Sequence, residues 1–279
     1  MGSPMETARS YPEIGRVKVS MSPLRTLLLA ILAGMFIALA GVGATFGNVY
    51  GNKIVGAAVF PAGLAMVIIA GSELFTGNCL LILPVLEKAI TVRQMLRNWA
   101  LVYAGNLIGA VLIAAMTVGG GTFDGVYDTV IATAAAKAAL PLPAALLRGI
   151  LCNILVCLAV WMAMAAKDVA GKIAGLYFPI FLFVLCGFEH CVANMFYLPA
   201  GVFAAARCGV SAENLTVYTM CIGNLLPVTL GNIIGGCAVG LVYRTVYLRG
   251  KRRLRNKSKP IHPAASRNGG IRRPCWRFL

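Results

Sequence analysis

"GSELFTGN" (residues 71–78) and "GFEHCVAN" (residues 187–194) each place a glutamate and small residues inside a long apolar run. Both follow the pattern Gly-x-Glu-x-x-x-x-Asn and lie 116 positions apart. The surrounding runs, 54–86 and 173–206, each exceed thirty residues. An unbroken helix of that length would measure roughly 50 Å, whereas the hydrocarbon core of a bilayer is about 30 Å thick. We therefore predict that both runs are membrane-spanning helices broken at these stretches.

The composition supports a membrane protein. The chain is 59% hydrophobic and 12% charged, with a mean hydropathy of +0.82, whereas soluble domains are about 25% charged. None of the nine cysteines shows Cys-x-x-Cys spacing. We interpret them as small apolar side chains that pack in the interior. We therefore expect no metal site and no cofactor. Four further segments of about 20 apolar residues are long enough to cross a bilayer: 27–46, 99–118, 144–166 and 224–243. The expected fold class is an all-α membrane protein with six transmembrane helices.

Two other landmarks recur in the same order as the broken runs. "LAGM" around Gly34 matches "LRGI" around Gly149, and "GNLIGA" from Gly105 matches "GNIIGG" from Gly231. These matches indicate a duplication of residues 27–118 as residues 144–243. Each copy has three spans, so the second must insert upside down relative to the first. Such inverted 3+3 repeats are typical of transporters and channels, with breaks near the bilayer midplane at the substrate site.

The distribution of lysine and arginine predicts the orientation, because cytoplasmic loops carry the excess of these residues. The basic set comprises Arg9, Arg16, Lys18, Arg25, Lys88, Arg93, Arg97, Lys167, Lys172 and the C-terminal tail; the opposite set holds only Lys53, Lys137 and Arg207. We expect a cytoplasmic N-terminal segment (1–26), a transmembrane domain (27–248) and a disordered basic cytoplasmic tail (249–279). We expect the basic tail to lie near anionic lipid of the cytoplasmic leaflet, which attracts clustered lysine and arginine. It has no interleaved aromatic platform for nucleic acid, so we expect no nucleic-acid partner.

Ionisable residues at the breaks are functional candidates, because a charge at the bilayer centre costs about 2.5 to 3.5 kcal/mol. Glu73 and Glu189 can each be explained more simply as caps that accept backbone N–H groups of the broken helices. His190 is either a hydrogen-bonded core residue or a group whose proton moves near neutral pH. Lys137 is either a snorkelling interfacial lysine or part of a loop that aims its ammonium group at a pore. Polar side chains available to line a pocket are Thr76, Asn78, Asn153 and Asn194, and candidate apolar constrictions are Leu74, Phe75, Phe60, Leu64 and Phe183.

Over residues 20–249 the chain resembles the formate/nitrite transporter family. The resemblance is carried by "AGSELFTGN" (70–78), "NWALVYAGNLIGA" (98–110), "CNILVCLAVWMA" (152–163), "GFEHCVANMF" (187–196) and "NLLPVTLGNIIGG" (224–236). It implies an aquaporin-like protomer in a homopentamer of the cell membrane, with one pore per subunit. The expected substrates are small monovalent anions such as formate, nitrite, hydrosulfide, acetate or lactate.

The resemblance also implies roles for individual residues. The family's central histidine falls on His190 and its loop threonine on Thr76, which follows the gating residues Leu74 and Phe75. Its lysine falls on Lys137. Asn153, Glu189 and Asn194 would support the lysine and the histidine, while Phe60, Leu64 and Phe183 would form the slits. The acid in "GSELFTGN" and the basic Arg148 look closer to the nitrite and hydrosulfide branches than to formate channels.

The function we expect is a passive or proton-coupled pore for small weak-acid anions. Lys137 would attract the anion, two apolar slits would exclude hydrated ions, and His190 would assist protonation of the anion between them. One alternative is a neutral-solute pore of the water or glycerol type, although paired Asn-Pro-Ala motifs are missing. Another is a membrane-embedded enzyme that uses Glu189 and His190 as an acid/base pair, with Cys191 as the nucleophile.

Overall fold

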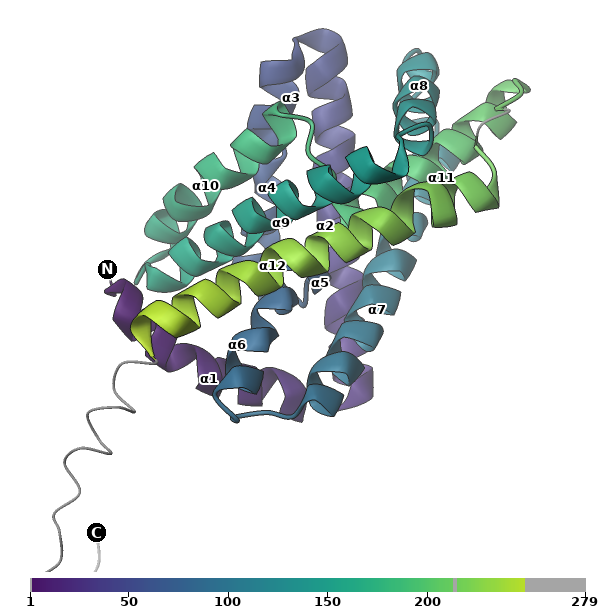
Figure 1. The fold of residues 1–279 in the computed structure, drawn as a ribbon. Helices are drawn as coiled ribbons and strands as arrows, with labels where there is room; N and C mark the ends of the chain where they lie inside the picture. Colours follow the sequence, from purple (N-terminus) through teal and green to yellow (C-terminus); the bar gives the residue numbers. More distant parts are fainter. Residues whose placement is uncertain (1, 213–214, 249–279) are drawn as a thin grey trace, which may run out of the picture.

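A computed structural model describes residues 2–212 and 215–248, and these residues form helices and connecting loops without a strand. The elements shown in Figure 1 are α1 (Pro4–Ser20), α2 (Pro23–Tyr50), α3 (Lys53–Val59), α4 (Pro61–Ile69), α5 (Phe75–Asn78), the 3₁₀ turn η1 (Cys79–Leu81), α6 (Ile82–Leu86), α7 (Val92–Gly119), α8 (Tyr127–Ala138), α9 (Leu142–Ala165), α10 (Val169–Leu185), α11 (Cys191–Cys208), the π-helical η2 (Thr219–Leu225) and α12 (Leu226–Tyr247). The predicted tail, 249–279, lies outside the described residues. The all-helical class is confirmed.

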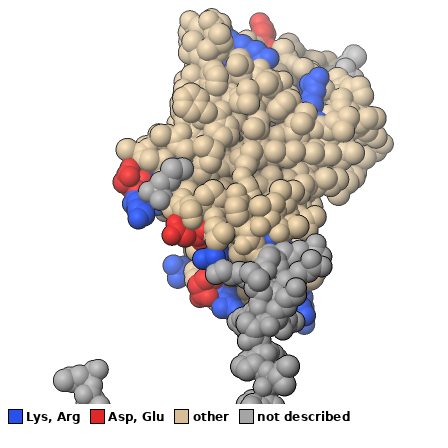
Figure 2. Space-filling model, turned by 60° about the vertical axis from the view of Figure 1, so that its left-hand side comes forward, with Lys and Arg blue, Asp and Glu red and all other residues tan. Residues whose placement is uncertain are grey.

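Five stretches are long and apolar enough to cross a membrane: α2, α7, α9, α11 and η2 with α12. Large apolar side chains such as Phe178, Leu226 and Leu241 remain exposed on the surface of the protomer. Figure 2 shows a broad face without charged side chains, whereas Lys, Arg, Asp and Glu gather toward its two ends. A surface of this kind suits contact with lipid or with other membrane-embedded subunits.

Both long apolar runs are interrupted at the quoted stretches. In the first run α4 ends at Ile69 and α5 begins at Phe75; in the second, α10 ends at Leu185 and α11 begins at Cys191. Gly71 (φ 77°) and Gly187 (φ 68°) start the two connections. A residue with a side chain is strained in this left-handed region, so glycine is required at both turns.

Small residues let the long helices pack closely. An added Cβ at Gly109 would collide with the carbonyl oxygen of Ile31, where α7 crosses α2. At the matching point of the other half, a Cβ at Gly235 would collide with the carbonyl oxygen of Ile150, where α12 crosses α9. Close approach through glycine is a common way for helices to associate in membranes.

One helix is additional to the prediction, and two local expectations change. Residues 4–20 form α1, whose N-cap Ser3 makes a capping box with Glu6 and whose Tyr11 is buried against Trp161. Lys137 lies in the last turn of a helix, α8, and not in a loop, because the alanine-rich segment before it favours helix. The alignment of Gly34 with Gly149 is wrong by one helical turn, as the hydrogen bonds described below establish.

Candidate functional site

Glu189 anchors a buried polar cluster between α8, α11 and η2. Lys137 Nζ lies 3.0 Å from both of its carboxylate oxygens. Asn194 Nδ2 donates to Glu189 Oε2 at 2.6 Å and to Asn224 Oδ1 at 2.7 Å. Asn224 Nδ2 in turn donates to the carbonyl oxygen of Lys137 at 2.9 Å. The cluster therefore fixes both the backbone and the ammonium group of Lys137.

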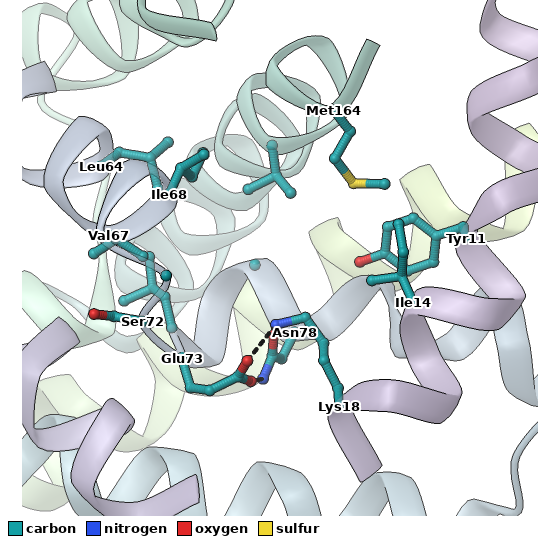
Figure 3. Close-up of a pocket in the computed structure, with 14 residues that line it drawn as sticks. Tyr11, Ile14, Lys18, Leu64, Val67, Ile68, Ser72, Glu73, Asn78 and Met164 are labelled. Carbon is teal, nitrogen blue, oxygen red and sulfur yellow. Dashed lines mark hydrogen bonds and ion pairs between the residues drawn. The ribbon is translucent and has the colours of Figure 1, made fainter. Parts of the chain in front are cut away.

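Glu73 anchors an equivalent cluster in the first half of the chain. Lys18 Nζ reaches from α1 to Glu73 Oε1 at 2.7 Å, and Asn78 Nδ2 donates to Glu73 Oε2 at 2.7 Å. Figure 3 shows both contacts, with Lys18 and Asn78 meeting the carboxylate from different elements. Asn78 Nδ2 also donates to Asn98 Oδ1 at 2.9 Å. Lys18 is thus the counterpart of Lys137, a site residue that the sequence analysis did not single out.

Two asparagines hold the backbone of the breaks. Asn106 Oδ1 accepts from Phe75 N at 2.9 Å, and its Nδ2 donates to the carbonyl oxygens of Ala30 and Glu73. Asn232 accepts from Cys191 N at 2.9 Å and donates to the carbonyl oxygens of Gly149 and Glu189. These bonds pair "GNLIGA" with "GNIIGG" as expected. They also pair Ala30, and not Gly34, with Gly149.

The expectation that Glu73 and Glu189 cap the broken helices is wrong. Their carboxylates bind lysine and asparagine side chains. The first N–H of each following helix is bound instead by Asn106 or Asn232. Because these asparagines come from other helices, 31 and 41 residues further along the chain, a local sequence pattern cannot indicate them.

His190 lies between the two clusters and is the N-cap of α11. Its Nδ1 accepts from Ala193 N at 3.1 Å, and its Nε2 lies 2.9 Å from Thr76 Oγ1. An imidazole nitrogen that accepts a hydrogen bond carries no proton, so the proton of the neutral ring is on Nε2 and points to Thr76. Both side chains are buried. The structure therefore brings together the predicted central histidine and loop threonine, which are 114 residues apart.

A pocket opens on either side of this pair. The Lys18 pocket, of about 260 Å³, lies among α1, α4, α9 and the loop before α5 (Figure 3); it is lined by Tyr11, Ile14, Lys18, Leu64, Val67, Ile68, Gly71, Ser72, Glu73, Leu74, Gly77, Asn78, Val160 and Met164. The Lys137 pocket, of about 160 Å³, is lined by Thr45, Asn48, Phe60, Thr129, Thr133, Lys137, Phe183, Val184, Gly187, Phe188, Glu189, His190, Ala193 and Tyr197. Each pocket contains one of the two lysine–glutamate pairs.

The predicted constriction residues divide between the pockets. Phe60 and Phe183 line the Lys137 pocket, where their rings make an edge contact at 5.6 Å and Phe183 stacks on His190 at 5.8 Å. Leu64 and Leu74 line the Lys18 pocket. Phe75 lines neither; its ring packs against Tyr103 at an apolar groove on the surface.

The remaining predicted residues lie around the pair. Asn153 Nδ2 donates to the carbonyl oxygens of Thr76 and Asn232, so it supports the backbone at Thr76 and does not contact Lys137.

Ser72, which the sequence analysis did not single out, lines the Lys18 pocket with a hydroxyl group that has no partner among the described residues. The side chain of Arg148 is exposed, while its carbonyl oxygen accepts from Glu189 N at 3.3 Å. No group of three metal-ligating side chains occurs in the part of the chain described.

Comparisons with known proteins identify the family of the chain. Residues 5–245 match the model of the family described as "Formate/nitrite transporter". The chain is 39% identical to a probable formate transporter of Methanothermobacter thermautotrophicus, covering 88% of this chain and 97% of the relative. It is also 39% identical to the formate channel FocA of Escherichia coli strain K12, covering 88% and 94%.

Two solved structures share the fold. An FNT family ion channel superposes with a TM-score of 0.76 at 32% identity, covering 86% of this chain and 97% of the other. A pentameric formate channel with formate bound superposes with a TM-score of 0.70 at 33% identity, covering 81% and 98%. The chain is therefore a multi-pass membrane protein that belongs to the formate/nitrite transporter family.

Proposed function

We propose that the protein conducts small monovalent weak-acid anions through a pore that joins the Lys18 pocket, the His190–Thr76 pair and the Lys137 pocket. The observation that carries this proposal is the placement of one lysine–glutamate pair on each side of a buried, apolar-walled histidine. The chain belongs to a transporter family. We therefore do not retain the alternative in which Glu189 and His190 are the acid/base pair of an enzyme.

The finer topology is part of the proposal. We infer an aquaporin-like 3+3 inverted repeat, with both breaks near the bilayer midplane and with both termini in the cytoplasm. The proposed parts are a cytoplasmic segment (1–26), a channel domain (27–248) and a basic cytoplasmic tail (249–279). The duplicated bonds of Asn106 and Asn232 support the repeat. The lysine and arginine distribution supports the orientation, which places the Lys18 pocket on the cytoplasmic side. The pentameric relative supports a homopentamer.

Electrostatics and desolvation together suggest the mechanism. Each lysine attracts an anion into its pocket, and the neighbouring glutamate limits how tightly the anion is held. A bare ion cannot pass the apolar slits, because the idealised cost of moving a small ion into an apolar medium is of order 20 kcal/mol. The same surroundings favour the neutral form of a weak acid. We infer that formate, nitrite or hydrosulfide gains a proton as it leaves a lysine pocket and crosses as the neutral acid.

The hydrogen bonds of His190 favour a role as a donor over a role as the proton source. A charged imidazolium would carry a proton on Nδ1, which would then face the N–H of Ala193 at 3.1 Å. Neutral His190 has only its Nε2–H to give, and loss of that proton would leave an imidazolate. His190 and Thr76 therefore assist by offering hydrogen bonds to the acid between the slits, while the transferred proton comes from water in the pocket and the hydroxide left behind leaves to the bulk solvent on the same side.

A flux assay on liposomes tests the proposal with formate, nitrite, hydrosulfide and chloride, together with water as the neutral alternative. We expect weak-acid flux that rises as pH falls, with one proton accompanying each anion, and little chloride flux. The His190→Asn variant keeps a side-chain acceptor for Ala193 N but loses the donor to Thr76. Its flux should fall about tenfold, as expected for one lost hydrogen bond, with the proton coupling intact.

Three results would contradict the proposal or its mechanism. Equal flux of all four anions in wild type and His190→Ala would exclude selection at the histidine, and a dominant water flux would favour the neutral-solute pore. Loss of proton coupling in His190→Asn, with anion flux retained, would make His190 the proton source. The relative flux rates of formate, nitrite and hydrosulfide in the same assay show whether the substrate preference of this chain resembles that of the formate, nitrite or hydrosulfide branch of the family.

A further inference from the structure

Tyr11 of α1 adds an unpaired hydroxyl group to the Lys18 pocket, and the proposed mechanism gives it no role. The residue is 1% exposed and lines the pocket. Figure 3 shows its hydroxyl oxygen pointing into the pocket. That oxygen makes no hydrogen bond with the described part of the chain. A buried hydroxyl group without a partner is costly, so an occupant of the pocket is expected to accept its bond.

Aromatic stacking fixes the position of this hydroxyl group. The Tyr11 ring stacks on Trp161 of α9, with centroids 6.1 Å apart and planes inclined by 15°. Tyr243 of α12 stacks on the same indole at 4.2 Å, but it lies outside the Lys18 pocket. Burial raises the pKa of Tyr11 well above its ordinary value. The hydroxyl group therefore keeps its proton and is available as a hydrogen-bond donor.

Lys18 provides a second donor on the same face of α1, because it follows Tyr11 by two helical turns. Its ammonium group has three N–H bonds, of which one meets Glu73 within the described residues. Both oxygens of Glu73 already accept, from Lys18 and from Asn78. In Figure 3 the Ser72 hydroxyl points away from Tyr11 and Lys18. The spare donors that face the pocket therefore come from α1.

A substrate with two oxygen atoms matches these donors. The pocket volume of about 260 Å³ has room for a small anion and several waters, since a water takes up about 30 Å³. Formate and nitrite each carry two oxygens, so one can accept from Lys18 while the other accepts from Tyr11. Hydrogen bonds to an ionised oxygen are strong, whereas sulfur is a weak acceptor.

We propose that Tyr11 binds the anion in the Lys18 pocket and selects oxyanions such as formate and nitrite over hydrosulfide. The inference rests on the proposed function and names the substrate class of that pocket. Tyr11 Oη donates to one oxygen of the anion, while Lys18 supplies the charge. Because Trp161 holds the ring in place before the anion arrives, little ordering is required on binding. Tyr11 thus sets how tightly the anion is held on this side of the pore.

The conservative variant Tyr11→Phe tests the proposal, because it keeps the ring on Trp161 and removes only the hydroxyl group. Uptake of formate, nitrite and hydrosulfide is measured against concentration in inside-out and right-side-out membrane vesicles. Vesicles from cells without the protein supply the background. Tyr243→Phe is the matched control, since it removes a hydroxyl group from the other ring on Trp161, outside the Lys18 pocket. It should behave like wild type.

We expect Tyr11→Phe to raise the half-saturating concentration of formate and of nitrite about tenfold, as for one lost hydrogen bond to a charged group. The rise should occur in one vesicle preparation only, which is the inside-out one in the proposed orientation. Hydrosulfide should change by less than about twofold, because sulfur accepts weakly. An equal change for all three anions, or no change for formate and nitrite, would overturn the proposal. An equal rise in both preparations would overturn it as well, because only the Lys18 pocket is lined by Tyr11.

Failure of this inference and failure of the proposed function give different results. If wild type takes up the anions and Tyr11→Phe is unchanged, only the role of Tyr11 is lost. If wild type takes up none of them, the proposed function fails, and thermal stabilisation by formate in detergent decides the role of Tyr11. At the same formate concentration Tyr11→Phe should then gain less stability than Tyr243→Phe. Equal gains would overturn the proposal.

Discussion

At the residue scale, we expect the Lys137–Glu189 pair to affect both the stability of the fold and the attraction of the anion. The side chains are 18% and 5% exposed, and Asn194 also binds the carboxylate. Removing one partner of such a pair leaves a buried charge without compensation, at a cost of about 3–5 kcal/mol. Removing both charges together avoids that cost. The pair therefore permits a test in which stability and transport separate.

We predict that Lys137→Gln and Glu189→Gln each lower the thermal stability, whereas the double variant recovers most of it. Anion flux should stay low in Lys137→Gln and in the double variant, because both lack the attracting charge. Thermal unfolding in detergent and liposome flux measure the two effects. The exposed Arg16–Glu13 pair supplies the control, since Glu13→Gln should change stability by less than about 1 kcal/mol. Recovery of flux in the double variant would contradict the attracting role of Lys137.

At the element scale, the breaks depend on asparagines supplied by other helices. Asn232 satisfies the first N–H of α11 and the carbonyl oxygens of Gly149 and Glu189. Replacing it with leucine leaves three buried backbone groups unpaired, each costing about 1–3 kcal/mol. The break would then open without a change in any residue that lines the pockets. Asn106 has the same function for α5.

We predict that Asn232→Leu exposes Cys191, which is fully buried in the native protein. The measurement is the rate of maleimide labelling of Cys191, with Cys191→Ser as the background. Asn232→Asp retains the acceptor for Cys191 N and should label more slowly than Asn232→Leu. The exposed N-cap Asn52 of α3 is the control, because Asn52→Ala should cost only about 1 kcal/mol and leave Cys191 protected. Equal labelling of the wild type and Asn232→Leu would mean that the asparagine does not hold the break.

The ends of α4 and α10 at Ile69 and Leu185 lie where the sequence predicted an interruption, because the glycine turn and the glutamate that mark it are close together in the chain. The Gly34–Gly149 alignment failed by four residues, one helical turn, because small residues recur at that spacing along a packed helix face. Lys18 was missed for a different reason. It lies 55 residues from Glu73 on a helix with an ordinary amphipathic composition. Nothing local distinguishes it from a solvated lysine until α1 packs against α6, α7, α9 and α12.

At the scale of the whole molecule, the two halves place similar chemistry at opposite ends of one protomer. In Figure 1, α1 and α6 lie at one end, and α3 and α8 lie at the other. The proposed pore is therefore nearly symmetric in its lysine–glutamate pairs but not in its centre, because His190 corresponds in position to Leu74. Such symmetry suits flux in either direction, set by the anion and proton gradients. The proposed orientation in the membrane therefore rests on the distribution of lysine and arginine.

We predict that intact cells label Cys208 with a membrane-impermeant maleimide, whereas inside-out vesicles label Cys275 of the basic tail. Cys208 ends α11 on the side of Lys137 and is exposed; few lysines and arginines lie on that side, so it should face outward. Cys208→Ser should remove the label in intact cells, and Cys275→Ser the label in vesicles. Cys186 and Cys221 are also exposed, but they lie among apolar residues on the side of the protomer that we expect to face lipid or a neighbouring subunit. A membrane-impermeant reagent should therefore label neither of them in either preparation. Labelling of Cys208 only in inside-out vesicles would reverse the proposed orientation and place the Lys137 pocket, rather than the Lys18 pocket, on the cytoplasmic side.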